Sequence, residues 1–279
     1  MGQLAPLRYL KRPILVFTVT DRRKDISAGV ASTHDFALTS AGRVVPNYAL
    51  ERSIIYCCDV ASERVWYTIV PDVRAVFDSV FVYQAQRAMA THVLSVPLEV
   101  LEEREHFVHP QPVFVFSIGR CGSTLLSSLL KATGRLSISE PDIFTQLAVL
   151  RPIERLVLGG VGTSEIIRSS VASFARLCGR RTFLKLRHHC NVLWPQINLA
   201  TPDANLVFML RDRIDWARSR HRVFGDGPEA LVTVLRDGIV CLDSMIRGGL
   251  TPMIVWYEDL ISDPFGTLQC LGIESDGRG

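Results

Sequence analysis

The sequence lacks several features that would point to particular classes of protein. No apolar run approaches the ~20 residues that a membrane-spanning helix needs, and the first residues lack the apolar core and small-residue cleavage site of a secretory signal peptide. The formal net charge is only +3, which is too small to indicate a nucleic-acid partner. We therefore expect a protein without a transmembrane segment that does not bind nucleic acid.

The cysteines form no recognisable pattern of disulfide partners or metal ligands, and lysine is scarce. The seven cysteines are an odd number and are scattered without the spacing of metal ligands. Cys57 and Cys58 lie in an apolar, strand-like run, where thiols are usually buried, so a reduced, cytoplasmic protein is expected. Only four of the 31 basic residues are lysine. Arginine therefore supplies most of the positive charge, and its planar guanidinium suits anion binding.

One segment carries most of the chemical information. An apolar, β-branched run from Pro112 to Phe116 leads into Ser117–Thr124, which reads SIGRCGST, and a helical pattern follows as far as Gly134. In a strand–turn–helix of this kind, backbone N–H groups and the positive end of the helix converge on one anion. The sequence therefore predicts a phosphate or sulfate site, although the same residues would also make a simple tight turn.

The loop departs from the nucleotide-triphosphate pattern G-x-x-x-x-G-K-[ST] at two positions. Ser117 replaces the first Gly and Ser123 replaces the Lys, whereas Gly122 and Thr124 fit. The local cation is Arg120 instead. A magnesium-bound triphosphate would lose its main charge partner here, so a P-loop kinase-like phosphotransferase is the less favoured alternative.

A second segment has the composition of a phosphate site. Asn205–Leu210 predicts a buried parallel strand, and Arg211 follows at its carboxyl end, where open α/β sheets bind ligands. Ser219 comes eight residues later, on a predicted helix, and can add a hydroxyl group. The alternative is a solvated, salt-bridged helix start with Arg218 and Arg220 on its surface.

Together these segments resemble the sulfotransferases that use 3′-phosphoadenosine 5′-phosphosulfate (PAPS) as donor. Residues 120–126 match the R-x-G-[ST]-[ST]-L-L arrangement of the family's 5′-phosphosulfate loop. Arg211 and Ser219 have the spacing of the family's 3′-phosphate ligands, and Tyr257–Pro264 is similar to its Y-E-D-L-x-x-D-P element. The resemblance covers about residues 112–273.

The resemblance implies an enzyme that moves a sulfuryl group from PAPS to a hydroxyl or amine by in-line displacement, with PAPS as co-substrate and no metal. The acceptor would be a small molecule, a glycan or a peptide, and the sequence does not identify it or the oligomeric state. The implied donor-binding residues are Gly119, Arg120, Cys121, Gly122, Ser123, Thr124, Arg211 and Ser219.

Glu140 is the first candidate for the catalytic base. It follows the predicted strand Leu136–Ser139, so its backbone lies at the carboxyl edge of the sheet beside the loop. An equivalent Glu is the base in some sulfotransferases. The alternative is a structural carboxylate that pairs with Arg120 or caps the next helix.

His189 is the second candidate. It lies twenty-two residues before Arg211. In cytosolic sulfotransferases a K-x-H element lies at about this distance, and its His is the catalytic base. Here Arg187 stands where that element has its His. A His base has a pKa close to working pH. Lys185 or Arg187 is expected to contact the bridging oxygen or the sulfate, and Arg120 and Lys185 are expected to bring positive charge to the transferring group.

The order of the predicted elements indicates an α/β fold. Strand-like runs alternate with helical segments, which predicts a three-layer, P-loop-type parallel sheet flanked by helices. Residues 1–108 are expected to form a small N-terminal α+β lobe and residues 109–279 the sulfotransferase-like core. The predicted core strands are Pro112–Ile118, Leu136–Ser139, Thr182–Leu186, Asn205–Leu210 and Met253–Tyr257.

The N-terminal lobe carries no chemical motif. Its predicted elements are a strand at 13–20, a β-hairpin at 53–59 and 64–70, a helix from Asp72 to Ala85 and a short helix at 97–104. The lobe covers one edge of the sheet or shapes the acceptor pocket. The helical region 143–174 could lie over the site as a lid.

The chain stops at Gly279, soon after a helix predicted over Leu260–Leu271. Sulfotransferases usually continue with a basic, Gly-containing segment that closes over the 3′-phosphate and adenine. A non-catalytic or weakly active module that binds PAPS or its product, adenosine 3′,5′-bisphosphate, is therefore the other alternative.

Overall fold

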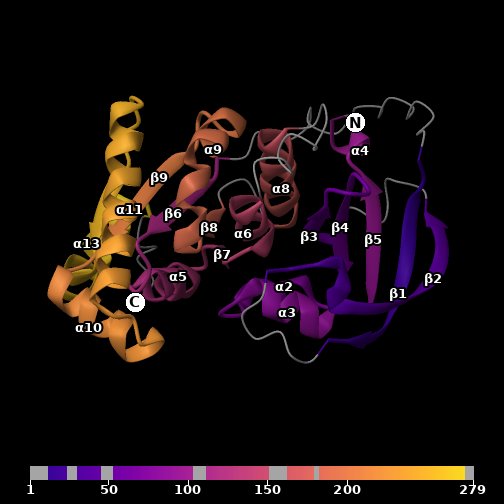
Figure 1. The fold of residues 1–279 in the computed structure, drawn as a ribbon, viewed down its shortest axis with the longest axis horizontal. Helices are drawn as coiled ribbons and strands as arrows, with labels where there is room; N and C mark the ends of the chain where they lie inside the picture. Colours follow the sequence, from indigo (N-terminus) through magenta and orange to yellow (C-terminus); the bar gives the residue numbers. More distant parts are fainter. Residues whose placement is uncertain are drawn as a thin grey trace.

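The computed structural model describes residues 12–23, 30–44, 53–102, 111–150, 162–178 and 182–273. Within these ranges the chain forms two five-stranded sheets, one antiparallel and one parallel (Figure 1). The predicted boundary between residues 108 and 109 lies outside the described residues. The same holds for residues 151–161 of the region 143–174 and for the last residues, 274–279.

The second half of the chain contains the parallel sheet, with the strand order β10-β9-β6-β8-β7. All five predicted core strands are confirmed, and the fold is α/β, with this sheet flanked by helices. All residues of the central strand β6 are buried, which explains its continuous apolar run. The strands are β6 (Val113–Ser117), β7 (Ser137–Ser139), β8 (Phe183–Lys185), β9 (Asn205–Leu210) and β10 (Met253–Trp256).

Helices join the parallel strands, and none of the described helices is long and apolar enough to cross a membrane. The prediction of one helix over Leu260–Leu271 is wrong, because two separate helices meet at Asp263. The Asp263 side chain accepts a hydrogen bond from the Gly266 N–H at 2.9 Å and so caps the start of the second helix. The helices are α5 (Ser123–Ala132), α6 (Asp142–Val149), α8 (Thr163–Cys178), η2 (His188–Leu193), α9 (Trp194–Ala200), α10 (Arg213–Phe224), α11 (Pro228–Arg247), α12 (Tyr257–Ser262) and α13 (Pro264–Cys270).

The first half of the chain forms the antiparallel sheet, in the order β2-β1-β5-β4-β3. The predicted strand and β-hairpin are confirmed, but β2 and β5 were not predicted. Both pair with β1, so contacts between distant parts of the chain select them. The strands are β1 (Ile14–Arg22), β2 (Phe36–Val44), β3 (Ser53–Asp59), β4 (Arg64–Ile69) and β5 (His92–Pro97), with the short helix η1 (Thr33–Asp35) before β2.

The predicted helix from Asp72 to Ala85 is two helices, α2 (Val73–Asp78) and α3 (Val82–Met89). Asp72 caps α2 as predicted, because its side chain accepts the Ala75 N–H at 3.0 Å. The backbone is extended at Ser79 and Phe81, which separates the helices. The short helix predicted at 97–104 is α4 (Glu99–Glu102), and Pro97 belongs to β5.

Helices α6 and α8 lie between the two sheets (Figure 1), where both contact β3. Gln146 of α6 accepts the Cys58 N–H at 2.7 Å and donates to the Cys58 carbonyl at 2.6 Å. It thereby satisfies the open edge of β3. One continuous apolar core includes buried residues from both sheets. The described part of region 143–174 thus joins the sheets, and none of it lines the cavity described next.

Candidate functional site

A cavity of about 530 Å³ lies at the carboxyl edge of the parallel sheet. Parallel strands end at the same edge, so residues far apart in the sequence meet there. Phe81 and Tyr83, at the start of α3, add a wall from the first half of the chain. The parallel strands β6 to β10 each deliver lining residues at their carboxyl ends or just beyond them: Ser117, Gly119, Arg120, Gly122, Ser123 and Thr124; Glu140; Lys185, Arg187, His188 and His189; Arg211; and Tyr257.

The loop between β6 and α5 is built around three residues with positive φ. Gly119, Arg120 and Gly122 have φ values of 73°, 60° and 80°. This region is free for Gly but strained for Arg120. Trp216 Nε1 donates to the Gly119 carbonyl at 2.8 Å, and Arg211 Nη1 lies 3.4 Å from the Arg120 carbonyl. Turns of this kind gather N–H groups into an anion-binding concavity.

Tyr257 packs directly on this loop. A Cβ atom at Gly122 would overlap the Tyr257 ring, and the Arg211 guanidinium lies 4.1 Å from the centre of the same ring. Glu258 Oε1 accepts the Asp212 N–H at 3.1 Å. The Y-E-D-L segment therefore supports both the loop and the turn that carries Arg211.

Arg120 links the two sequence segments that were assigned to the donor. Its Nε donates to Ser219 Oγ at 3.2 Å. Arg211 lines the cavity, whereas Ser219 lies behind Arg120 and is not part of the cavity wall. Arg211 Nε is buried without a hydrogen-bond partner in the structure.

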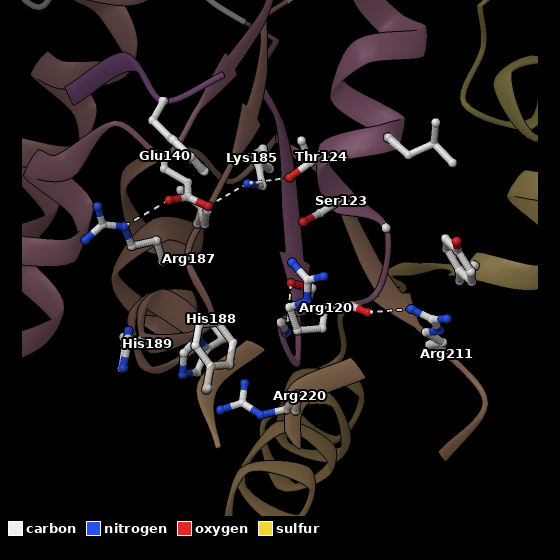
Figure 2. A pocket seen from close by; sticks show the side chains of 18 of the residues that line it. Arg120, Ser123, Thr124, Glu140, Lys185, Arg187, His188, His189, Arg211 and Arg220 are labelled. Atoms are coloured by element: carbon white, nitrogen blue, oxygen red, sulfur yellow. Dashed lines mark hydrogen bonds and ion pairs between the residues drawn. The ribbon is translucent and has the colours of Figure 1, made fainter. Parts of the chain in front are cut away.

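Glu140 and Lys185 form the centre of a second cluster, on the other side of the loop (Figure 2). Glu140 accepts from Lys185 Nζ at 2.5 Å and from Arg187 Nε at 3.1 Å. In the alternative in which Glu140 is a structural carboxylate, its partners are therefore Lys185 and Arg187 and not Arg120. Lys185 Nζ also lies 3.3 Å from Thr124 Oγ1. Arg187 Nη1 reaches Asp142 at 3.1 Å, and burial raises the pKa of that carboxyl.

The rings of His188 and His189 are in contact, with their centres 3.8 Å apart and their planes tilted by 37°. Burial, together with the neighbouring His189 and Arg220, lowers the pKa of His188 to about 4. Burial and the positive charge of Arg187 also lower the pKa of His189. Both rings are therefore neutral near pH 7 and able to accept a proton. His188 lies nearer to the loop, and His189 lies on the side of His188 that faces away from the loop (Figure 2).

Cys121 is the predicted donor-binding residue whose side chain turns away from the cavity. It is fully buried, and burial raises the pKa of its thiol to about 12. The side chain is therefore an unreactive filler, and only the backbone of Cys121 can contact an anion in the loop.

Arg220 is a site residue that the sequence did not reveal, because its place in the sequence also fits a solvated helix. It is only 5% exposed, and its Nε and Nη2 lie 2.6 Å from Asp226 Oδ2. Its Nη1 is buried without a hydrogen-bond partner and lies beside Gly119. The available signal is its position four residues after the buried Trp216, which puts both on one face of α10.

No group of three or more His, Cys, Asp or Glu side chains in the described part of the chain is arranged to hold a metal ion. The sequence matches no model of a known protein family, and no curated protein matches it either.

Proposed function

We propose that this protein is a PAPS-dependent sulfotransferase. The observation that carries the proposal is a positive-φ loop flanked by Arg211 and Arg220, each with a buried N–H atom that has no partner. A buried donor without an acceptor costs about 1–3 kcal/mol, so these groups favour an anionic ligand. Among the described residues that line the cavity, five are Lys or Arg and one, Glu140, is acidic.

The donor fits these residues in two parts. The backbone of residues 119–124, with Thr124 and Arg120, would hold the 5′-phosphosulfate. Arg211 would hold the 3′-phosphate, as the family resemblance implies. Ser219, which the resemblance also implies, lies outside the cavity wall and accepts a hydrogen bond from Arg120 Nε at 3.2 Å, so it would position the Arg120 guanidinium instead. Lys185, from the neighbouring strand, lies 3.3 Å from Thr124 Oγ1 and supplies a charge that Ser123 lacks.

In the proposed reaction, an acceptor oxygen or nitrogen forms a bond to sulfur while the bond between sulfur and the bridging oxygen breaks. The electron pair stays on the 5′-phosphate of the departing bisphosphate, and the acceptor's proton passes to a base. Lys185 stabilises the charge that develops on the bridging oxygen. We propose Glu140 as the base, because it lies beside Lys185, whereas His189 lies farther from the loop than His188 does (Figure 2).

We further propose that the parallel sheet is of the P-loop type and that the first half of the chain is an accessory lobe. Phe81 and Tyr83 from this lobe line the cavity beside Glu140, so the acceptor would bind at this end. The acceptor can be a small molecule, a glycan or a peptide. The cytoplasmic location stays a prediction from the cysteine pattern.

Binding of adenosine 3′,5′-bisphosphate tests the proposal. A hundredfold excess over its Kd should stabilise the protein by about 2.7 kcal/mol, which raises the melting temperature by several degrees. Arg211→Ala should remove the shift, whereas Arg213→Ala, exposed two residues away, should keep it. The absence of any shift at millimolar bisphosphate would refute the proposal.

Two further results separate the alternatives. A shift with Mg-ATP but none with bisphosphate would indicate a phosphotransferase. A bisphosphate shift without transfer of labelled sulfate from PAPS to any acceptor in a metabolite or lysate pool would indicate a non-catalytic binding module.

A further inference from the structure

Helix α11 carries an exposed apolar stripe on the parallel-sheet half of the molecule, away from the antiparallel sheet (Figure 1). Val232, Ile239 and Ile246 are 66%, 44% and 55% exposed. They are seven residues apart, so they follow one another on the same side of the helix. Single exposed apolar residues are ordinary, but three in a row on one helix indicate a contact surface.

Two opposite charges complete this stripe. Arg236 and Asp243 lie between the apolar residues, so positions 232, 236, 239, 243 and 246 read Val, Arg, Ile, Asp, Ile. The alternating spacing of four and three is that of a coiled-coil seam. Arg236 pairs with Asp237 at 3.1 Å and Asp243 with Arg247 at 2.8 Å, and all four side chains are more than half exposed. Such surface pairs contribute little to stability, so both charges can take a new partner.

The stripe is complementary to itself in the antiparallel direction. If two copies of α11 pack about a two-fold axis near Ile239, Val232 of one copy faces Ile246 of the other. Arg236 then faces Asp243 at both ends of the contact. A parallel arrangement would instead set Arg236 against Arg236 and Asp243 against Asp243, and like charges across an interface are unfavourable.

We propose that this stripe of α11 is the interface of a two-fold symmetric dimer of this chain. A closed two-fold contact uses the same patch on both copies, which the order Val, Arg, Ile, Asp, Ile permits. The proposal goes beyond the sulfotransferase assignment and does not depend on it. A different protein that covers the stripe is an outcome of the test below.

Measurement of the mass in solution tests the interface. The wild-type protein should have twice the 31.1 kDa mass of one chain in sedimentation or light scattering at micromolar concentration. Ile239→Lys should give the monomer mass. Ala230→Lys, on the same helix but half a turn around from Ile239 and also exposed, should stay dimeric. Thermal melting confirms that each variant is folded.

A charge exchange tests the pairing itself. Arg236→Glu places two acidic residues opposite each other and should raise the dimer dissociation constant at least tenfold. Adding Asp243→Lys restores opposite charges at both contacts and should recover most of the affinity. A monomeric wild-type protein, an Ile239→Lys variant as dimeric as wild type, or no recovery in the double variant would overturn the proposal. A monomer would leave the stripe to a different protein.

Discussion

Glu140 and Lys185 are joined twice at the carboxyl edge of the parallel sheet. The Glu140 N–H donates to the Lys185 carbonyl at 2.8 Å, and Lys185 Nζ donates to Glu140 Oε1 at 2.5 Å. The backbone bond continues the β7–β8 ladder one residue past the strands, and Glu140 has a φ of 56°. This strained conformation is fixed by both bonds, so the carboxylate and the ammonium group keep their positions relative to Thr124.

Glu140→Gln should lower the rate of sulfate transfer by at least 100-fold, because the amide keeps the shape of the carboxylate but accepts no proton. His189→Gln should change the rate only a few-fold. The measurement is the transfer of labelled sulfate from PAPS, with bisphosphate-induced melting shifts as the control for donor binding. If His189→Gln is the variant that loses activity while Glu140→Gln keeps it, His189 is the base.

Gly122→Ala should weaken bisphosphate binding and lower the melting temperature, because its new Cβ overlaps the Tyr257 ring. Gly134→Ala is the matched control. Its φ of 74° is close to the 80° of Gly122, but nothing lies within 4 Å of its added Cβ. It should cost only the backbone strain, about 1–2 kcal/mol, with bisphosphate binding unchanged. Equal effects of the two variants would mean that the contact with Tyr257 does not shape the loop.

Arg220→Lys should raise the dissociation constant of PAPS about tenfold, because it preserves the charge beside Asp226 but removes the fork that carries Nη1. Tenfold corresponds to about 1.4 kcal/mol, close to the lower end of the range for a hydrogen bond to a charged group. Arg218→Lys on the same helix, 72% exposed in its pair with Asp215, should bind PAPS as wild type does. Calorimetry measures both, and unaltered affinity in Arg220→Lys would exclude an Nη1 contact with the donor.

Stability should fall at acidic pH partly through His188. Its pKa is about 4 in the folded protein and about 6.5 when unfolded, so the unfolded chain binds more protons between these values. The free energy of unfolding therefore decreases as pH drops from about 6.5 towards 4, by about 3 kcal/mol at most from this group. Urea unfolding at pH 7 and pH 5 should show a smaller loss for His188→Gln than for wild type. His34→Gln, which changes an exposed ring, should lose as much as wild type, and an unchanged loss in His188→Gln would contradict this assignment.

Local sequence patterns were sufficient to predict the strands of the parallel sheet and the loop between β6 and α5. Strands such as β6 and β9 are short runs of consecutive apolar residues, and most of these residues are buried. The glycines at 119 and 122 mark the backbone conformations with positive φ that other residues adopt only under strain. Since parallel strands end at one edge, the sequence also predicted that Glu140, Lys185 and Arg211 would lie near the loop.

The tertiary structure decided what depends on distant contacts. Strands β2 and β5 form because β1 pairs with them. Arg220 is buried because Asp226 and the loop surround it, and Glu140 pairs with Lys185 and Arg187 because β7 and β8 are neighbours. The sequence by itself thus determined the core strands and the loop with positive φ at Gly119 and Gly122, since these follow from residues adjacent in the chain. Only the fold decided that Arg211 Nε and Arg220 Nη1 are buried without a hydrogen-bond partner, because that depends on which distant side chains it brings together.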